Sequence, residues 1–290
     1  MTHNIYGVIP PMTTPFDQNG DIDFAALRAD VRYLIDEAKV HGLAVGGSTG
    51  EGHTLTQDEL RQVVSAAVDE AAGRVPIIAG IIVDSTRQAV ECAAKLADLD
   101  VAALQVTPVH YLFRPTDDAL FQHFKTLAES TQHPVIIYNV VPWVYLAPEL
   151  LTRIITEVPG VIGVKQSAGD LKTMADLMIL LEDQGLVMAA TDALLYPAYT
   201  LGAHGSIAAI LQAAPKLSVD LWDAVQAGNH TAALEHHKKL LGIWNAIMDD
   251  NLPANVKTAM RLQGRDGGLP RAPMPVSSPE QEVAIKNALG

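Results

Sequence analysis

Lys165 stands at the end of an apolar run, VIGVK (161–165), which is typical of a strand buried inside a protein. Burying a charged amine is costly, so a lysine in such a place tends to lose its proton, and a neutral amine attacks carbonyl carbons. Lys165 is therefore a candidate for Schiff-base chemistry. The alternative is an ordinary lysine whose stem packs while its ammonium group reaches solvent or a carboxylate.

Tyr138 and the segment GGSTGEG (46–52) carry groups that such a lysine would need. Tyr138 lies near the end of another apolar run, PVIIYNV (134–140), so its hydroxyl either relays protons or points to solvent from a core position. The glycine-rich segment offers the hydroxyls of Ser48 and Thr49, and a turn of backbone N–H groups that suits an anion such as a carboxylate. A glycine-rich turn without any ligand is an equally open interpretation.

Eight short apolar runs alternate with longer segments whose apolar residues recur at helical spacing. The runs are rich in Val and Ile and barely alternate with polar residues, as is typical of parallel strands covered on both faces. This order favours an α/β fold, a (β/α)8 TIM barrel with additional C-terminal helices, over a doubly wound open sheet. The predicted strands are residues 6–10, 43–47, 75–82, 101–106, 134–140, 161–165, 186–190 and 205–210.

The chain continues well beyond its eighth predicted strand, with further stretches of helical pattern and no linker before them. We expect residues 1–214 to form the barrel and residues 215–290 to form a helical extension packed on it, as a single structural unit. The uncharged stretch 193–215 is long enough for a membrane span, but Pro197 and Gly202 interrupt it. It is better interpreted as helix, turn and strand.

The formal net charge of −13, without any cluster of Lys and Arg, argues against nucleic acid or an anionic membrane as a partner. The lone cysteine, Cys92, cannot form an internal disulfide, and residues 1–11 lack the pattern of a signal peptide. We therefore expect a cytoplasmic protein. The spacings HExxH, CxxC, GxGxxG and GK[ST] do not occur, which argues against a metal site or a nucleotide site.

In a barrel of this kind the active site forms where the strands end at their carboxyl side. The polar residues that follow the predicted strands should therefore meet at one rim. They are Ser48, Thr49, His110, Tyr111, Tyr138, Lys165, Ser167 and Asp192.

The motifs GGSTGEG, YNV and GVKQSAGD, in this order and spacing, resemble the N-acetylneuraminate lyase / dihydrodipicolinate synthase family. The resemblance implies a barrel with C-terminal helices, a homotetramer, and a Schiff base between the strand-6 lysine and a 2-oxo acid such as pyruvate. It implies no metal or organic cofactor, since the imine itself supplies the chemistry.

Matched motif by motif, the resemblance makes Lys165 the imine-forming lysine and Tyr138 the tyrosine that shuttles protons beside it. Ser48 and Thr49 would hold the carboxylate of the 2-oxo acid, and Ser48 would also join the proton relay. The backbone at Ile207 would face the same carboxylate.

Several departures from the family pattern bear on the substrate. The run YNVVPWVYLAPEL (138–150) lacks the arginine that is usual in the synthase branch, so the chain is nearer the neuraminate lyase-like branch, which has a threonine at the position of Ser167. Ala193 and Ala209, however, stand where that branch binds sugar hydroxyls, which argues against sialic acid.

The loop after the fourth strand also departs from the family, which often has a pair of tyrosines there. One tyrosine of that pair crosses into the active site of a neighbouring subunit. Here His110 stands at the position of the relay tyrosine and Tyr111 follows it, so either is a candidate substitute. Trp143 and Tyr145 make the distal pocket more apolar than a sugar site.

The leading hypothesis is a class I lyase or aldolase that cleaves, or condenses, a 4-hydroxy-2-oxo acid with pyruvate as the enamine-forming partner. The alternative is a 2-keto-3-deoxy sugar acid dehydratase that works through the same imine of Lys165. Dihydrodipicolinate synthase, and a barrel that binds a 2-oxo acid without turnover, rank below both.

Overall fold

The structure is a computed structural model that describes residues 5–290. Residues 1–4 belong to the N-terminal segment on which the absence of a signal peptide was predicted, and they lie outside the described residues.

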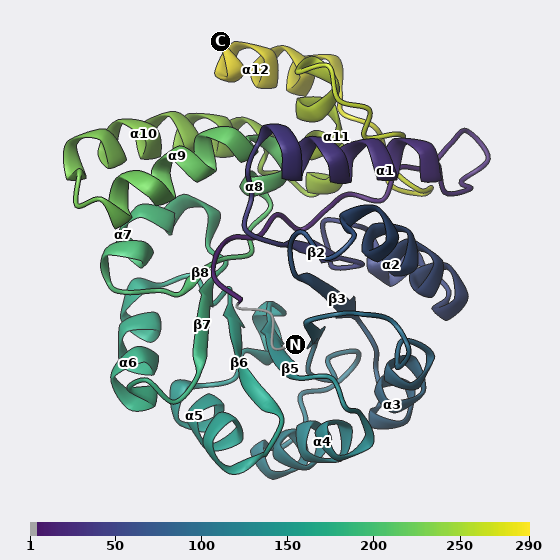
Figure 1. Cartoon of the computed structure of the whole chain (residues 1–290), viewed down its shortest axis with the longest axis vertical. Coiled ribbons are helices and arrows are strands. Elements are labelled where there is room, and N and C mark those ends of the chain that lie inside the picture. The colour runs from purple at the N-terminus through teal and green to yellow at the C-terminus, as the bar shows by residue number, and fades with distance from the viewer. Residues whose placement is uncertain (1–4) are drawn as a thin grey trace.

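Eight parallel strands form one sheet, in the order β1-β8-β7-β6-β5-β4-β3-β2, and helices surround it (Figure 1). The ring closes between the outer two strands, because Met12 N donates to Ala44 O over 2.8 Å and Ala44 N donates to Pro10 O over 2.9 Å. The predicted TIM barrel is therefore confirmed. The strands are β1 Gly7–Val8, β2 Leu43–Val45, β3 Ile77–Ile81, β4 Ala103–Val106, β5 Val135–Asn139, β6 Val161–Gln166, β7 Leu186–Ala189 and β8 Gly205–Ser206.

All eight predicted strands are present, and most are shorter than the apolar run that predicted them. The largest difference is at 205–210, where only Gly205 and Ser206 are in the sheet and a short helix begins at Ile210. Apolar residues beyond a strand end can stay buried in the rim loops, so burial alone does not show where a strand ends.

Helices follow the strands and cover the outside of the barrel (Figure 1). The helix that begins at Gln57 is stabilised at its start by a reciprocal capping box between Thr56 and Glu59. The helices are α1 Phe24–Arg32, α2 Gln57–Ala71, α3 Thr86–Lys95, α4 Asp117–Ser130, α5 Pro148–Glu157, α6 Leu171–Leu181, α7 Leu195–Thr200 and α8 Ile210–Ala213.

The barrel has an outer core between strands and helices and a small inner core that fills its lumen. The inner core consists of Ile5, Ile9, Ala44, Ile78, Ala103, Ile136, Met188 and Ile207. Successive residues of a strand face opposite sides, so Gln105 shares the inward face of β4 with Ala103, and Tyr138 shares that of β5 with Ile136. The lumen is therefore apolar below and becomes polar near the carboxyl ends of the strands.

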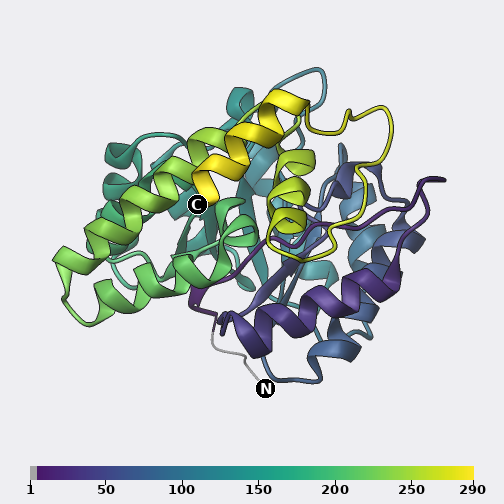
Figure 2. The ribbon, with the colours of Figure 1, turned by 90° about the horizontal axis from the view of Figure 1, so that it is seen from above.

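Beyond β8 the chain forms α9 Pro215–Gln226, α10 His230–Ile247, α11 Leu252–Leu262 and α12 Pro279–Leu289. Helix α9 packs against α10, and α12 lies against α10 and α11 (Figure 2). The predicted boundary falls between α8 and α9, and the division into barrel and extension stays a prediction.

The uncharged stretch 193–215 contains the predicted helix and strand as α7 and β8, and additionally the short helix α8. Across residues 5–290, no helix combines the length and the apolar character that a membrane crossing requires.

Candidate active site

Lys165 and Tyr138 are direct neighbours in the parallel ladder between β5 and β6. Both side chains are buried, and Lys165 Nζ lies 4.2 Å from the centroid of the Tyr138 ring. No carboxylate within residues 5–290 lies within ion-pair distance of this ammonium nitrogen. The Lys165 amine thus lies in the lumen without an ion-pair partner among residues 5–290.

The Tyr138 hydroxyl is held by the turn that follows β2. It donates to Ser48 Oγ over 2.9 Å and accepts from Ser48 N over 3.3 Å. Burial raises the pKa of Tyr138, but the positive charge of Lys165 and the hydrogen bonds with Ser48 outweigh it, so this pKa lies below its ordinary value. Lys165, Tyr138 and Ser48 therefore form a continuous group that can move a proton near the amine.

The turn 46–52 leaves several donors unused. Gly46 has a φ of +77°, and a Cβ there would lie 2.3 Å from Leu60 Cδ1, so only glycine fits at this position. The N–H groups of Thr49 and Gly50, and the hydroxyl of Thr49, form no hydrogen bond with any described residue. Free donors converging in a tight turn suit a carboxylate, which supports the interpretation of this turn as an anion site.

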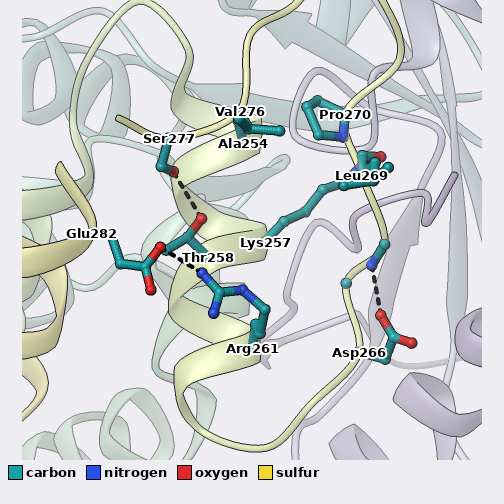
Figure 3. A pocket seen from close by; sticks show the side chains of 12 residues that line it. Ala254, Lys257, Thr258, Arg261, Asp266, Leu269, Pro270, Val276, Ser277 and Glu282 are labelled. Carbon is teal, nitrogen blue, oxygen red and sulfur yellow. Dashed lines mark hydrogen bonds and ion pairs between the residues drawn. The ribbon is translucent and has the colours of Figure 1, made fainter. Parts of the chain in front are cut away.

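Glu51 anchors the same turn to the C-terminal helices. Its fully buried carboxylate accepts Lys257 Nζ over 2.6 Å and Arg271 N over 2.8 Å. Lys257 reaches from α11 past the backbone of Leu269, whose carbonyl it also binds over 2.7 Å (Figure 3). This pair is not evident from the sequence, because its members are 206 residues apart and no local pattern relates them.

Asn139 and Gln166 follow Tyr138 and Lys165 and point to the outside of the barrel. Asn139 Nδ2 donates to Gln166 Oε1 over 3.0 Å, and Gln166 Oε1 also accepts Ala168 N over 3.1 Å. Asn139 Oδ1 accepts Leu146 N over 2.9 Å. These bonds fix the loops after β5 and β6, and so position the two strand ends that carry Tyr138 and Lys165.

Asp192 follows β7 in a short helical turn, Asp192–Leu194. Its carboxylate accepts Ile210 N over 2.7 Å. Burial raises the pKa of Asp192 to about 6, against the opposing effects of that hydrogen bond and of the Lys165 charge. Ser167 lies near the ends of β5 and β6, where its carbonyl accepts the Tyr145 hydroxyl over 3.0 Å and its buried Oγ has no hydrogen-bond partner among the described residues.

Ile207 lies in the lumen, where its side chain belongs to the inner core. Its N–H donates to Ala189 O over 2.9 Å. The Ile207 N–H is therefore not free to bind a carboxylate. The predicted contact between this backbone and the carboxylate stays a prediction.

His110 and Tyr111 lie at the rim, and neither is hydrogen-bonded to Tyr138 or Ser48. His110 Nδ1 lies 3.1 Å from Pro108 O and 3.6 Å from Asp84 Oδ1. The Tyr111 ring is 69% exposed. Within a single chain, the structure does not bring either residue into the relay, and their predicted role stays a prediction.

The chain is similar to many known proteins. The dihydrodipicolinate synthetase family matches residues 4–289. The chain is 34% identical to the 4-hydroxy-tetrahydrodipicolinate synthase of Methanopyrus kandleri, over 100% of this chain and 97% of the relative. It is 31% identical to the enzyme of the same name from Bacillus subtilis, over 99% of both chains.

Solved structures of both branches superpose on the fold. A putative dihydrodipicolinate synthetase from Pseudomonas aeruginosa matches with a TM-score of 0.93 and 31% identity, over 98% of both chains. N-acetylneuraminate lyase from Mycoplasma synoviae matches with a TM-score of 0.87 and 26% identity, over 98% of this chain and 95% of that one. The relatives named here at 30% identity or more carry synthase or synthetase names. Dihydrodipicolinate synthase is the activity that ranked lower on the sequence alone.

Replacing Lys257 by methionine should strongly destabilise the protein, because the fully buried Glu51 carboxylate would lose its charged partner. We expect the free energy of unfolding to fall by roughly 3–5 kcal/mol in urea denaturation. Lys172→Met is the matched control, since Lys172 pairs with Asp176 at the surface. It should cost far less, because solvent screens the attraction between two exposed charges. Equal losses in the two variants would contradict the anchoring role of Lys257.

Asp192→Asn should change how stability depends on pH. Because its pKa is raised to about 6 in the folded protein, wild type loses stability as the pH rises through that value. The variant does not titrate there, so its free energy of unfolding relative to wild type should increase from about pH 4 to about pH 7. Urea denaturation across this range measures it.

Asp170→Asn is the control with the opposite sign, because hydrogen bonds from Thr173 lower the pKa of Asp170 in the folded protein. The wild-type carboxylate at position 170 adds stability as the pH rises through its lowered pKa toward about pH 5, so this variant should become relatively less stable up to about pH 5 and show a constant difference above it. A flat difference for Asp192→Asn would show that its carboxylate is not desolvated.

Proposed function

This chain belongs to the dihydrodipicolinate synthetase family of class I lyases, and on that premise we propose that Lys165 forms an imine with the keto carbon of a 2-oxo acid such as pyruvate. The single observation that carries the proposal is the buried Lys165 amine, which has no acidic partner among residues 5–290 and lies against Tyr138. The amine adds to the keto carbon, and loss of water from the carbinolamine leaves the imine. Since family members are lyases that use a lysine in this way, no metal or nucleotide is called for.

The imine draws electrons from the bond between C3 and C4 of a 4-hydroxy-2-oxo acid. When that bond breaks, the C4 hydroxyl loses its proton, the fragment from C4 onward leaves as an aldehyde, and carbons 1 to 3 stay on Lys165 as an enamine. Tyr138, bonded to Ser48, is the group that can take this proton. Protonation of the enamine at C3 and hydrolysis then release pyruvate, and the reverse sequence is a condensation.

Ser48 and Thr49 are proposed to hold the carboxylate of the 2-oxo acid. The unused N–H groups of Thr49 and Gly50 support this assignment, because a carboxylate would satisfy them. Ser167 and Asp192 lie at neighbouring strand ends and are proposed to contact the part of the substrate beyond C3.

A second candidate is condensation of pyruvate with an aldehyde, as the synthase names of the relatives indicate for those proteins. The run 138–150 supplies no arginine for a second carboxylate, which favours a less acidic aldehyde partner. Dehydration of a 2-keto-3-deoxy sugar acid uses the same imine and is the third outcome to test. Free pyruvate indicates cleavage, whereas water loss without pyruvate indicates dehydration.

Incubation with pyruvate followed by borohydride reduction should add one reduced pyruvate to Lys165, as measured by the mass of the protein and of its peptides. Lys165→Ala should show no adduct and no turnover, and Lys172→Ala, at an exposed lysine, should behave as wild type. Tyr138→Phe should still form the adduct but turn over roughly 10²–10⁴-fold more slowly, because it lacks the proton-transfer group. An unmodified Lys165 in the wild-type protein would refute the imine mechanism.

We further propose that the protein is a homo-oligomer, a homotetramer by resemblance, that contacts its neighbour through the rim beside the site. Tyr111, Leu112, Phe113 and Trp143 are 69%, 88%, 61% and 66% exposed there. Apolar surface of this extent is characteristic of an interface. The solved relatives include one described as a monomeric variant, so the state of this chain needs its own measurement. A cytoplasmic location is likewise proposed, and the single, buried Cys92 supports it.

The double substitution Leu112→Asp and Phe113→Asp should shift the protein to a smaller species in light scattering, because buried charges would oppose the contact. Val283→Asp, at an exposed apolar residue of α12, is the control and should leave the mass unchanged. An unchanged mass in the double variant would place the interface elsewhere.

A further inference from the structure

Gln105 is a buried polar residue in the lumen that neither the motifs nor the mechanism above uses. It lies on β4, its side chain is 1% exposed, and it faces inward like Ala103. Its Oε1 is fully buried and has no hydrogen-bond partner among the described residues. Leaving a buried acceptor unpaired is costly, and such groups are rare in folded proteins unless water or a ligand satisfies them.

The amide of Gln105 lies beside the turn that is proposed to bind the carboxylate. Its Nε2 is 3.8 Å from the point that a Cβ on Gly47 would occupy, and the Tyr138 hydroxyl is 3.6 Å from the same point. Gly47 does not have the left-handed backbone that requires glycine, and these contacts are ordinary ones. An alanine would therefore fit at position 47 without strain. Because Gly47 has no side chain, a space remains between Gln105 Nε2 and the Tyr138 hydroxyl, directly before Ser48.

Packing does not explain an amide at position 105. A methionine has the same length and shape, would fill the lumen equally well, and would bury no unpaired polar atom. The NH₂ group already lies on the side of Gly47, and its Nε2 forms no hydrogen bond with any described residue. The residue thus offers a strong donor next to Ser48 and Thr49.

We propose that the side-chain amide of Gln105 donates a hydrogen bond to the carboxylate of the bound 2-oxo acid and completes the anion site of the turn 46–52. This inference rests on the proposed function, because it assumes that a 2-oxo acid binds in the lumen. Gln105 is a binding residue in this account and takes no part in proton transfer. Its NH₂ group gains an acceptor when the acid is bound, whereas Oε1 stays unpaired because a carboxylate cannot donate to it.

The test compares Gln105→Met and Gln105→Glu with wild type in borohydride trapping on Lys165, over a range of ketone concentrations. With pyruvate, Gln105→Met should need roughly 10- to 100-fold more ketone for half-maximal trapping, the loss expected for one hydrogen bond to a charged group. With methyl pyruvate, whose carboxylate is esterified, Gln105→Met and wild type should trap alike. Gln105→Glu should bind pyruvate more weakly still and recover as the pH is lowered, because its carboxylate repels that of the ligand.

Thermal unfolding separates binding from folding. Gln105→Met should unfold at or above the wild-type temperature, because it removes a buried unpaired atom. Gln212→Met is the matched control. Gln212 lies on α8 and is also buried with an unpaired Oε1, but its Nε2 donates a hydrogen bond to Asp30. This control should unfold at a lower temperature and keep the wild-type dependence on pyruvate.

Three results would overturn the inference. If Gln105→Met needed the same pyruvate concentration as wild type for half-maximal trapping, Gln105 would not contact the carboxylate. An equal loss with pyruvate and methyl pyruvate would show an effect on Lys165 and not on the carboxylate. A lowered unfolding temperature that accompanies the loss would assign Gln105 a structural role. Absence of trapping in wild type is a separate result, which refutes the proposed function and the inference with it.

Discussion

The parallel ladder between β5 and β6 is the constraint on which the site depends. It places Tyr138 opposite Lys165, so the ring lies against the amine without any long-range adjustment. Because side chains alternate along a strand, the same ladder sends Asn139 and Gln166 outward, where they bond to each other and fix the following loops. Two adjacent dipeptides thus supply both the groups proposed to react and the bonds that position them.

The rest of the barrel divides the lumen by polarity. Below the site, the inner core is apolar and closes the barrel from one side. Above it, the Tyr138 hydroxyl and the amide of Gln105 lie next to Gly47 of the turn 46–52, whose Thr49 and Gly50 N–H groups have no partner among the described residues. A 2-oxo acid has a carboxylate and a keto group on adjacent carbons, so it matches an amine next to a set of donors.

The C-terminal helices contribute to the site indirectly. Lys257 and the backbone of Arg271 hold Glu51, and Glu51 ends the turn that carries Ser48 and Thr49. A buried ion pair is weak support for overall stability, because desolvation offsets much of its attraction. The effect of the ion pair on geometry is clearer, because two donors hold the fully buried Glu51 carboxylate in one position. The extension therefore sets the shape of a turn that lies more than two hundred residues earlier in the chain.

The sequence by itself determined the eight strands, the barrel, the later helices and the two motifs that meet at β5 and β6. These depend on local periodicity and on residues a few positions apart, which a chain displays directly. Only the tertiary structure revealed the Glu51–Lys257 pair, the unpaired amide of Gln105 and the distance of His110 and Tyr111 from the relay. Each of these depends on which distant segments approach one another, and no local pattern encodes that approach.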